Sequence, residues 1–226
     1  MNKLIVATMI IGTISNAHAG FGDFASKMTQ NVIGTSASSN VNVTDFLTQA
    51  SATNLLFQES RAALAATIST SKMSGEIQAK LKALKSTTNL QEKEAILASL
   101  EKPTDEVMAA SKKDEAETIE TIKNLSAEKK KYLLAAAQNF GIATLMAKDL
   151  AGGASQISTA IISNPQSLTS SGFTVGGAKN LVGDVTGIAK NSSMALVEVP
   201  QLFKKAGVEF TPPTSSKSKP QDIELN

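Results

Sequence analysis

Cysteine and tryptophan are absent from this chain of 226 residues, which holds one histidine and one tyrosine. Without cysteine the protein forms no disulfide, so packing alone must stabilise its fold. Zinc and copper sites are built largely from histidine and cysteine. Nucleophilic catalysis by serine or cysteine commonly uses histidine as the proton acceptor. We therefore predict no catalytic residues, no metal site, no cofactor and no enzymatic activity.

An excess of charge of one sign is also lacking. The net charge is +2, and Arg61 is the single arginine. Nucleic-acid binding calls for a basic patch, often with aromatic residues that stack on bases, so we predict no nucleic-acid partner. No glycine-rich phosphate-binding loop occurs. After the first 19 residues, no uninterrupted apolar run reaches the roughly 18 residues that indicate a membrane-spanning helix.

Residues 1–19 have the three parts of a secretory signal peptide. Lys3 supplies a positive charge, residues 4–14 form an apolar run, and residues 17–19 place alanines at the two positions that a signal peptidase recognises. The apolar run is shorter than the roughly 20 residues of a spanning helix. We predict export to the bacterial periplasm or the extracellular space, with cleavage before Gly20. Cleavage would also remove the only histidine.

The remainder of the chain divides by charge. Residues 20–71 carry five charged side chains, residues 72–131 carry 23, and residues 132–210 carry nine. The final 16 residues are rich in proline, serine and lysine and poor in apolar residues, a composition typical of disorder. We predict a flexible segment over residues 20–43, a single α-helical domain over 44–210 and a disordered tail over 211–226.

Good helix formers dominate from residue 44 to residue 206, and the alternating β-branched runs that indicate strands are missing. We predict an all-α helical bundle of about five to seven helices with a charged central helical hairpin. Residues 45–71 and 132–147 are apolar on two opposite sides of a helical wheel, which predicts helices packed between neighbours. Helix ends are predicted at Ser74-Gly75, Lys102-Pro103, Gly152-Gly153, Asn164-Pro165 and Pro200.

The charged hairpin contains the run KKDEAETIE at residues 112–120. Runs of mixed charge usually form a solvated helical face, and this is the interpretation that we favour. The alternative is a hairpin that projects from the body and contacts a partner. The residues that would face such a partner are Lys112, Lys113, Asp114, Glu115, Glu117 and Glu120.

Gly183 and Gly187 stand four residues apart in a segment, residues 177–200, that repeats like a helix. Four charged residues in the segment argue against a membrane-spanning dimer motif. On a helical wheel both glycines lie opposite the broad apolar face, near Met194. We predict that they let a second helix approach closely, either within the fold or from another chain. Contact of the apolar face with a membrane surface is the alternative.

These patterns leave several functions open. The first is an exported, non-enzymatic interaction or structural protein, an accessory subunit of a bacterial envelope, secretion or matrix assembly. Its partner would be another protein or further copies of itself. The second is a membrane-active helical protein, which resembles α-helical pore-forming toxins in outline only. The third is a carrier that holds a small apolar ligand between helices. An enzyme based on carboxylates ranks last, because the acidic residues cluster in the charged middle.

Overall fold

The computed structural model describes residues 42–69, 72–87, 90–168 and 173–223. Within these ranges every regular element is helical, which confirms the all-α helical bundle. The predicted signal peptide lies outside the described residues, as does nearly all of the predicted flexible segment. The helices are α2 (Val43–Ile68), α3 (Lys72–Ser86), α4 (Leu90–Lys113), α5 (Glu115–Lys123), α6 (Ala127–Ala151), α7 (Ala154–Ser163), α8 (Val175–Lys190) and α9 (Val199–Lys205), with a 3₁₀ turn over Pro165–Leu168 and a π-helical turn over Met194–Glu198.

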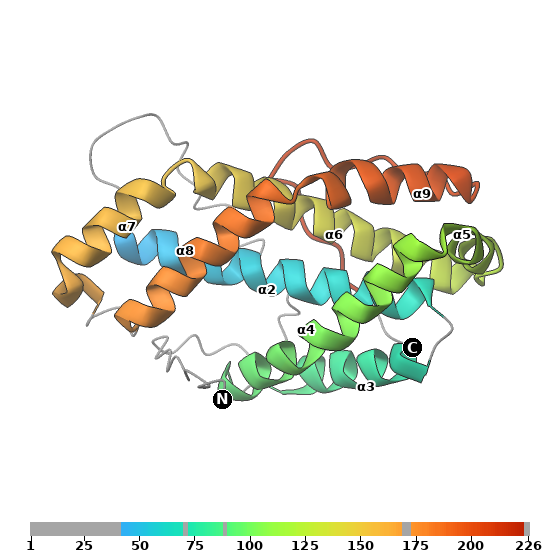
Figure 1. Ribbon diagram of the computed structural model, residues 1–226, viewed down its shortest axis with the longest axis horizontal. Helices are drawn as coiled ribbons and strands as arrows, with labels where there is room; N and C mark the ends of the chain where they lie inside the picture. The colour runs from blue at the N-terminus through green and yellow to red at the C-terminus, as the bar shows by residue number, and fades with distance from the viewer. Residues whose placement is uncertain (1–41, 70–71, 88–89, 169–172, 224–226) are drawn as a thin grey trace.

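Helices α2 and α6 form the centre of the bundle and lie side by side along its long axis (Figure 1). Small side chains such as Ala63 and Ala137 are fully buried between the helices and let the backbones approach closely. The rings of Phe57 and Phe140 stack across the pair, with their centroids 4.9 Å apart. The prediction that residues 45–71 and 132–147 form internal helices is confirmed over 45–68 and 132–147, whereas residues 70–71 lie outside the described residues.

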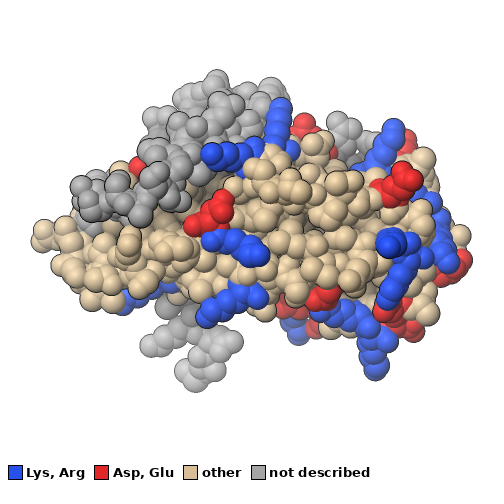
Figure 2. All heavy atoms as spheres, turned by 90° about the horizontal axis from the view of Figure 1, so that it is seen from above, with Lys and Arg blue, Asp and Glu red and all other residues tan. Residues whose placement is uncertain are grey.

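The other helices cover this pair at its two ends. Helices α3, α4 and α5 pack with α9 around one hydrophobic core, and helices α7 and α8 pack around a second. Charged side chains gather toward the end of the molecule where α5 lies, whereas the end formed by α7 and α8 is mostly uncharged (Figure 2). The uneven distribution of charge along the sequence thus becomes an uneven distribution in space.

Helix α4 runs through Pro103, so the predicted end at Lys102-Pro103 is wrong. Proline has no backbone N–H, and it therefore leaves the carbonyl four residues earlier without its helical donor. That carbonyl belongs to Ser99, and the ammonium group of Lys80 in α3 donates a hydrogen bond to it over 2.8 Å. A side chain from the neighbouring helix replaces the missing backbone bond, which allows α4 to continue.

Two further predicted ends are wrong. Ser74-Gly75 lies inside the first turn of α3, which begins at Lys72. Pro200 is the second residue of α9, which continues directly from the π-helical turn Met194–Glu198, so the proline lies within a continuous helical segment. The predicted ends at Gly152-Gly153 and Asn164-Pro165 are confirmed by the ends of α6 and α7.

The segment 177–200 is not one helix. Helix α8 ends at Lys190, and after a turn the chain resumes as the π-helical turn and α9. The apolar face predicted for the first part is correct, because its side chains are buried against α2 and α6. Because the helix is interrupted after Lys190, one helical wheel cannot relate positions before and after the interruption. The predicted placement of Met194 near Gly183 and Gly187 is therefore wrong.

The tail differs from the prediction of disorder. Residues 211–223 form no helix or strand, but they follow a defined path on which Pro213, Pro220 and Ile223 are buried. Ile223 joins the hydrophobic core formed by α2, α6 and α9. The composition of the tail gives no sign of this, because the surface that orders it belongs to a distant part of the chain.

Candidate functional site

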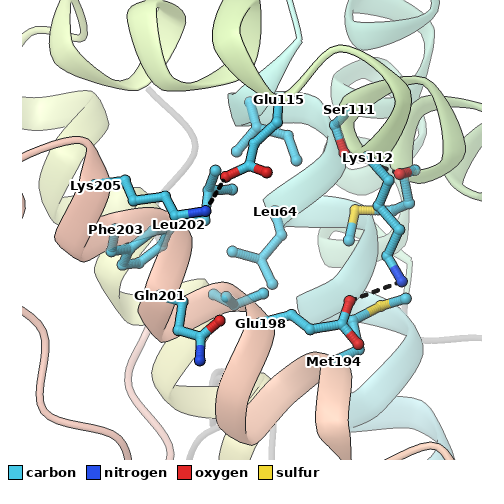
Figure 3. Close-up of a pocket in the computed structure, with 13 residues that line it drawn as sticks. Leu64, Ser111, Lys112, Glu115, Met194, Glu198, Gln201, Leu202, Phe203 and Lys205 are labelled. Carbon is cyan, nitrogen blue, oxygen red and sulfur yellow. Dashed lines mark hydrogen bonds and ion pairs between the residues drawn. The ribbon is translucent and has the colours of Figure 1, made fainter.

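A groove of about 330 Å³ lies between α2, the junction of α4 with α5, and the segment formed by the π-helical turn and α9 (Figure 3). It is open to solvent on one side. Its floor is apolar and consists of Leu64, Ile68, Met108, Met194, Val199 and Phe203. Polar side chains stand around the floor, so the groove combines an apolar surface with a charged rim.

Two ion pairs cross the groove and join the charged hairpin to the C-terminal helices. The ammonium of Lys112 lies 2.7 Å from a carboxylate oxygen of Glu198, and that of Lys205 lies 2.5 Å from a carboxylate oxygen of Glu115. Figure 3 shows the two pairs at opposite ends of the floor around Leu64. All four side chains are about half exposed, and such pairs contribute only about 0–1 kcal/mol each.

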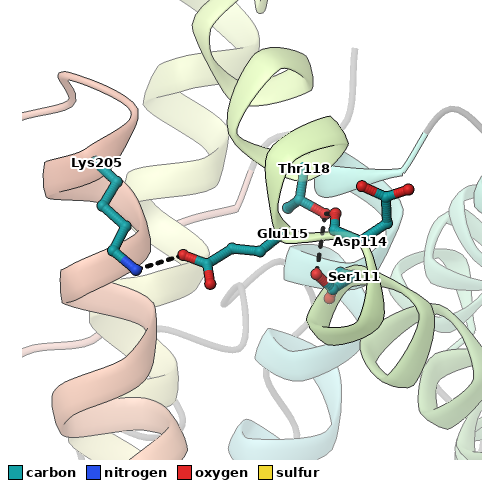
Figure 4. Close-up of polar contacts among 5 residues, drawn as sticks. All are labelled: Ser111, Asp114, Glu115, Thr118 and Lys205. Carbon is teal, nitrogen blue, oxygen red and sulfur yellow. Dashed lines mark hydrogen bonds and ion pairs between the residues drawn. The ribbon is translucent and has the colours of Figure 1, made fainter.

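The junction between α4 and α5 places these charges. The carboxylate of Asp114 caps α5 by accepting a hydrogen bond from the backbone N–H of Glu117 over 3.1 Å. The hydroxyl of Thr118 contacts the carbonyl oxygens of Ser111 and Asp114 at 3.2 and 3.0 Å, and so ties α5 back to α4 (Figure 4). The chain therefore turns sharply at Asp114, and Glu115 extends from the start of α5 toward Lys205.

Glu198 is held by two hydrogen-bond donors. Lys112 forms the charged pair described above, and the hydroxyl of Ser193 lies 3.2 Å from the other carboxylate oxygen. The hydrogen bond from Lys112 is the largest influence, and it lowers the pKa of the Glu198 carboxyl despite the partial desolvation that raises it. Glu198 also sits on a π-helical turn, a local irregularity that is frequent at functional sites.

The residues predicted to face a partner have different roles in the structure. Lys112 and Glu115 pair with the C-terminal helices of the same chain, and Asp114 caps a helix. Glu120 accepts a hydrogen bond from Asn124 on its own helix. Lys113 and Glu117 are exposed. Part of the predicted contact surface is thus the rim of the groove, and its contact with a partner stays a prediction.

None of the described helices covers Gly183 or Gly187. A Cβ atom added at either position would meet nothing within 4 Å among the described residues. Met194, predicted to lie beside them, instead lines the groove. Close approach of a helix within the described fold is therefore not observed, and contact with another chain stays a prediction.

Sequence reasoning missed most of the groove. Its floor comes from three segments, around Leu64, Met108 and Phe203, that lie far apart along the chain. No local spacing marks such a site, because it exists only once α9 has packed beside α5 and has come to face α2 across the groove. The one usable signal was the charged run at residues 112–120, which supplies part of the rim.

A carboxyl group lies inside the bundle. Glu59 of α2 is buried, and desolvation raises the pKa of its carboxyl, while the positive charges of Lys85 and Lys93 act in the opposite direction. Desolvation also raises the pKa of the Tyr132 hydroxyl, which is buried without a hydrogen-bond partner in the described part of the chain. Among the described residues, no cluster of three or more acidic or histidine side chains could hold a metal ion.

The described helices were compared with the requirements of a membrane-spanning helix. None of the described helices combines the length and apolar character that crossing a bilayer requires.

Comparisons of the chain with protein-family models, with curated proteins and with solved structures give no match. The protein is described by its own structure, as an all-α bundle that carries a groove with an apolar floor and a charged rim.

Proposed function

We propose that this is an exported, non-enzymatic interaction protein, an accessory subunit of a bacterial envelope, secretion or matrix assembly, and that the groove binds a protein partner. The observation that carries the proposal is the apolar floor between α2 and α9, bordered at each end by an ion pair. Buried apolar pockets surrounded by polar rims are the typical centres of protein interfaces.

The shape of the groove favours a protein partner over a small molecule. Its volume is at the lower end of the range for small-ligand sites, and it is open on one side. A small apolar ligand would keep part of its surface in water. An apolar side chain of a partner brings its own backbone to cover the opening, which removes more apolar surface from water.

The floor and rim supply different parts of recognition. Met108 and Met194 are flexible and polarisable, so the floor can adapt to an inserted side chain. The charges on the rim alternate in sign, with Lys112 beside Glu198 and Glu115 beside Lys205. Rim charges of this kind mainly determine orientation and the choice of partner. The expected partner therefore presents an apolar anchor flanked by one acidic and one basic residue.

The proposal is tested by blocking the groove. Leu202 lines it and is half-buried, so Leu202→Lys places a charge at the site. Val197 is exposed, lies in the same segment and does not line the groove, so Val197→Lys is the matched control. Tagged wild-type and variant proteins would be incubated with envelope and culture-supernatant fractions of the source cells, and bound proteins identified by mass spectrometry.

We expect one defined protein to be retained by the wild type and by Val197→Lys, and to fall at least about tenfold with Leu202→Lys, since one buried contact of about 1.4 kcal/mol changes affinity by that factor. Circular dichroism verifies that both variants remain helical. Equal retention by all three proteins would exclude the groove as the contact. Recovery of an apolar small molecule in place of a protein would favour a carrier.

A further inference from the structure

The residues after α9 form a strap, residues 208–223, that runs back along α6 (Figure 1). It contacts α6 at separate points and is not helical. Pro213 lies against Gly141, the backbone of Gln221 is bound to Asn139, and the hydroxyl of Ser216 hydrogen-bonds to the carboxylate of Asp149. These partners all lie on α6. The strap turns at residues 215–218, so that it reaches Asp149 with Ser216 and returns to Asn139 with Gln221.

Asn139 recognises the strap through its backbone. Its side-chain amide donates to the carbonyl of Gln221 over 2.8 Å and accepts from the N–H of the same residue over 2.7 Å. With the strap in place Asn139 is only 2% exposed, and Gln221 supplies partners for both its donor and its acceptor. Bonds to a backbone do not depend on side-chain identity, so Asn139 holds the strap at position 221 without selecting a side chain there.

The two other contacts add sequence preference. A Cβ atom at Gly141 would lie 2.6 Å from Cγ of Pro213, so the absence of a side chain on α6 creates the space that the proline ring fills. Ten residues later, Ile223 is 4% exposed and packs into the core with α6. The surface thus suits a segment that carries a proline and an aliphatic residue at this spacing, with a turn between them.

The strap is attached to the body in a way that permits release. Gly207 has a φ of +72°, and it is at this residue that the chain leaves α9 and turns back. Among the described residues, no backbone–backbone hydrogen bond joins the strap to the body after Val208, and the bond from Ser218 to Ser215 lies within the strap. Its composition is that of a segment which is ordered only when bound.

We propose that this face of α6 is a peptide-binding site, and that its ligand in an assembly is the strap of a second copy of this chain. Contacts made by an exchanged strap are the same as those made internally, so the balance depends on protein concentration and on strain at the turn. A strap of 16 residues extends over about 55 Å, and α6 is about 38 Å long, so a strap that swings out at Gly207 reaches a neighbour. The proposal goes beyond the groove and does not depend on it.

The chain contains no cysteine, which allows a direct test on the full-length protein. One preparation carries Asp149→Cys and another carries Ser216→Cys, two positions whose side chains touch in the structure. They are mixed at high concentration and treated with a short thiol-specific crosslinker, chosen as one that joins the two sites internally in the Asp149→Cys/Ser216→Cys double variant. In the control mixture the first partner carries Ser163→Cys, an exposed residue of α7.

We expect at least five times more covalent heterodimer in the Asp149→Cys mixture than in the control mixture, increasing with protein concentration. Adding Ile223→Asp to the Ser216→Cys partner should reduce the heterodimer to the control level, because a charged residue cannot enter the core. Equal heterodimer in the two mixtures, together with internal crosslinking of the double variant, would overturn the proposal and show that each strap stays on its own chain.

Discussion

Pro213 lies so close to Gly141 that a Cβ atom on the glycine would stand 2.6 Å from Cγ and 2.7 Å from Cδ of the proline ring. Glycine inside a helix is destabilising by about 0.5–1 kcal/mol relative to alanine. Gly141 lies in the middle of α6, where nothing in the helix itself requires glycine. The contact with the strap explains why position 141 holds glycine and not a residue with a side chain.

Gly141→Ala should therefore behave differently from Gly183→Ala. Gly183 is also inside a helix, and no described atom lies within 4 Å of a Cβ placed there, so alanine should raise the free energy of unfolding by about 0.5–1 kcal/mol. At Gly141 the new methyl group displaces the proline, and we expect no gain or a loss of about 1–2 kcal/mol. Urea unfolding followed by circular dichroism measures both values.

Limited trypsin digestion gives an independent measure of the same contact. Displacing Pro213 should speed cleavage after Lys217, an exposed residue of the strap, in Gly141→Ala but not in Gly183→Ala. Adding Pro213→Ala to Gly141→Ala removes the clash and should recover part of the lost stability. An equal gain from alanine at both glycines would mean that the strap does not press on Gly141.

Features that depend on a local pattern of residues could be predicted from the sequence, whereas contacts between distant segments could not. Apolar residues on two sides of α2 and α6 are a local pattern, so their central position could be predicted. Docking of the strap depends on Gly141 and Asn139, which lie about 70 residues or more before the segment that they bind. The groove likewise needs α9 to pack beside α5 and to face α2. Contacts between distant segments leave no periodic signal in the sequence.

Pro103 illustrates a failure of a local rule. The rule that proline ends a helix assumes that the freed carbonyl stays without a donor, and here Lys80 supplies one to Ser99. Lys80→Met should lower the free energy of unfolding by about 0.5–1.5 kcal/mol, whereas Lys82→Met, at an exposed lysine on the same helix, should change it little.

The same measurements in a Pro103→Ala background test the explanation. Alanine restores the backbone N–H that bonds to Ser99, so Lys80→Met should then have almost no effect on chemical denaturation. If Lys80→Met is equally destabilising in both backgrounds, the lysine stabilises the protein by some means other than replacing the missing bond.

Lys112, on the rim of the groove, should determine the pKa of the Glu198 carboxyl. Its hydrogen bond from Lys112 lowers the pKa of the carboxyl, so Lys112→Met should raise that pKa toward its ordinary value. Lys113→Met, one residue further along and without an ion pair in the described structure, should leave it unchanged. A carboxyl-detected NMR titration of Glu198 reports the pKa directly.

The sign of the associated stability change follows from linkage. A carboxyl whose pKa is lower when folded contributes stability above its unfolded pKa, and this contribution is lost as the pH falls through the folded value. The wild type should therefore lose its advantage over Lys112→Met on acidification below about pH 4.5. A difference between them that stays constant down to pH 3 would contradict the assigned role of Lys112.

Glu59 should show the opposite dependence on pH. Burial raises the pKa of its carboxyl, and the nearby positive charges of Lys85 and Lys93 only reduce that effect. The folded state therefore keeps a proton that the unfolded chain has released once the pH rises above about 4.5. The free energy of unfolding then falls by about 1.4 kcal/mol with each further pH unit, until the pH passes the pKa of the folded state.

Glu59→Gln removes the titrating group and keeps its size. We expect the variant to match the wild type near pH 4 and to be more stable than the wild type at pH 8, in urea unfolding at a series of pH values. Glu76→Gln, at an exposed residue of α3, is the control and should follow the wild type throughout. A stability difference for Glu59→Gln that does not change with pH would mean that the carboxyl ionises as easily in the folded bundle as in the unfolded chain.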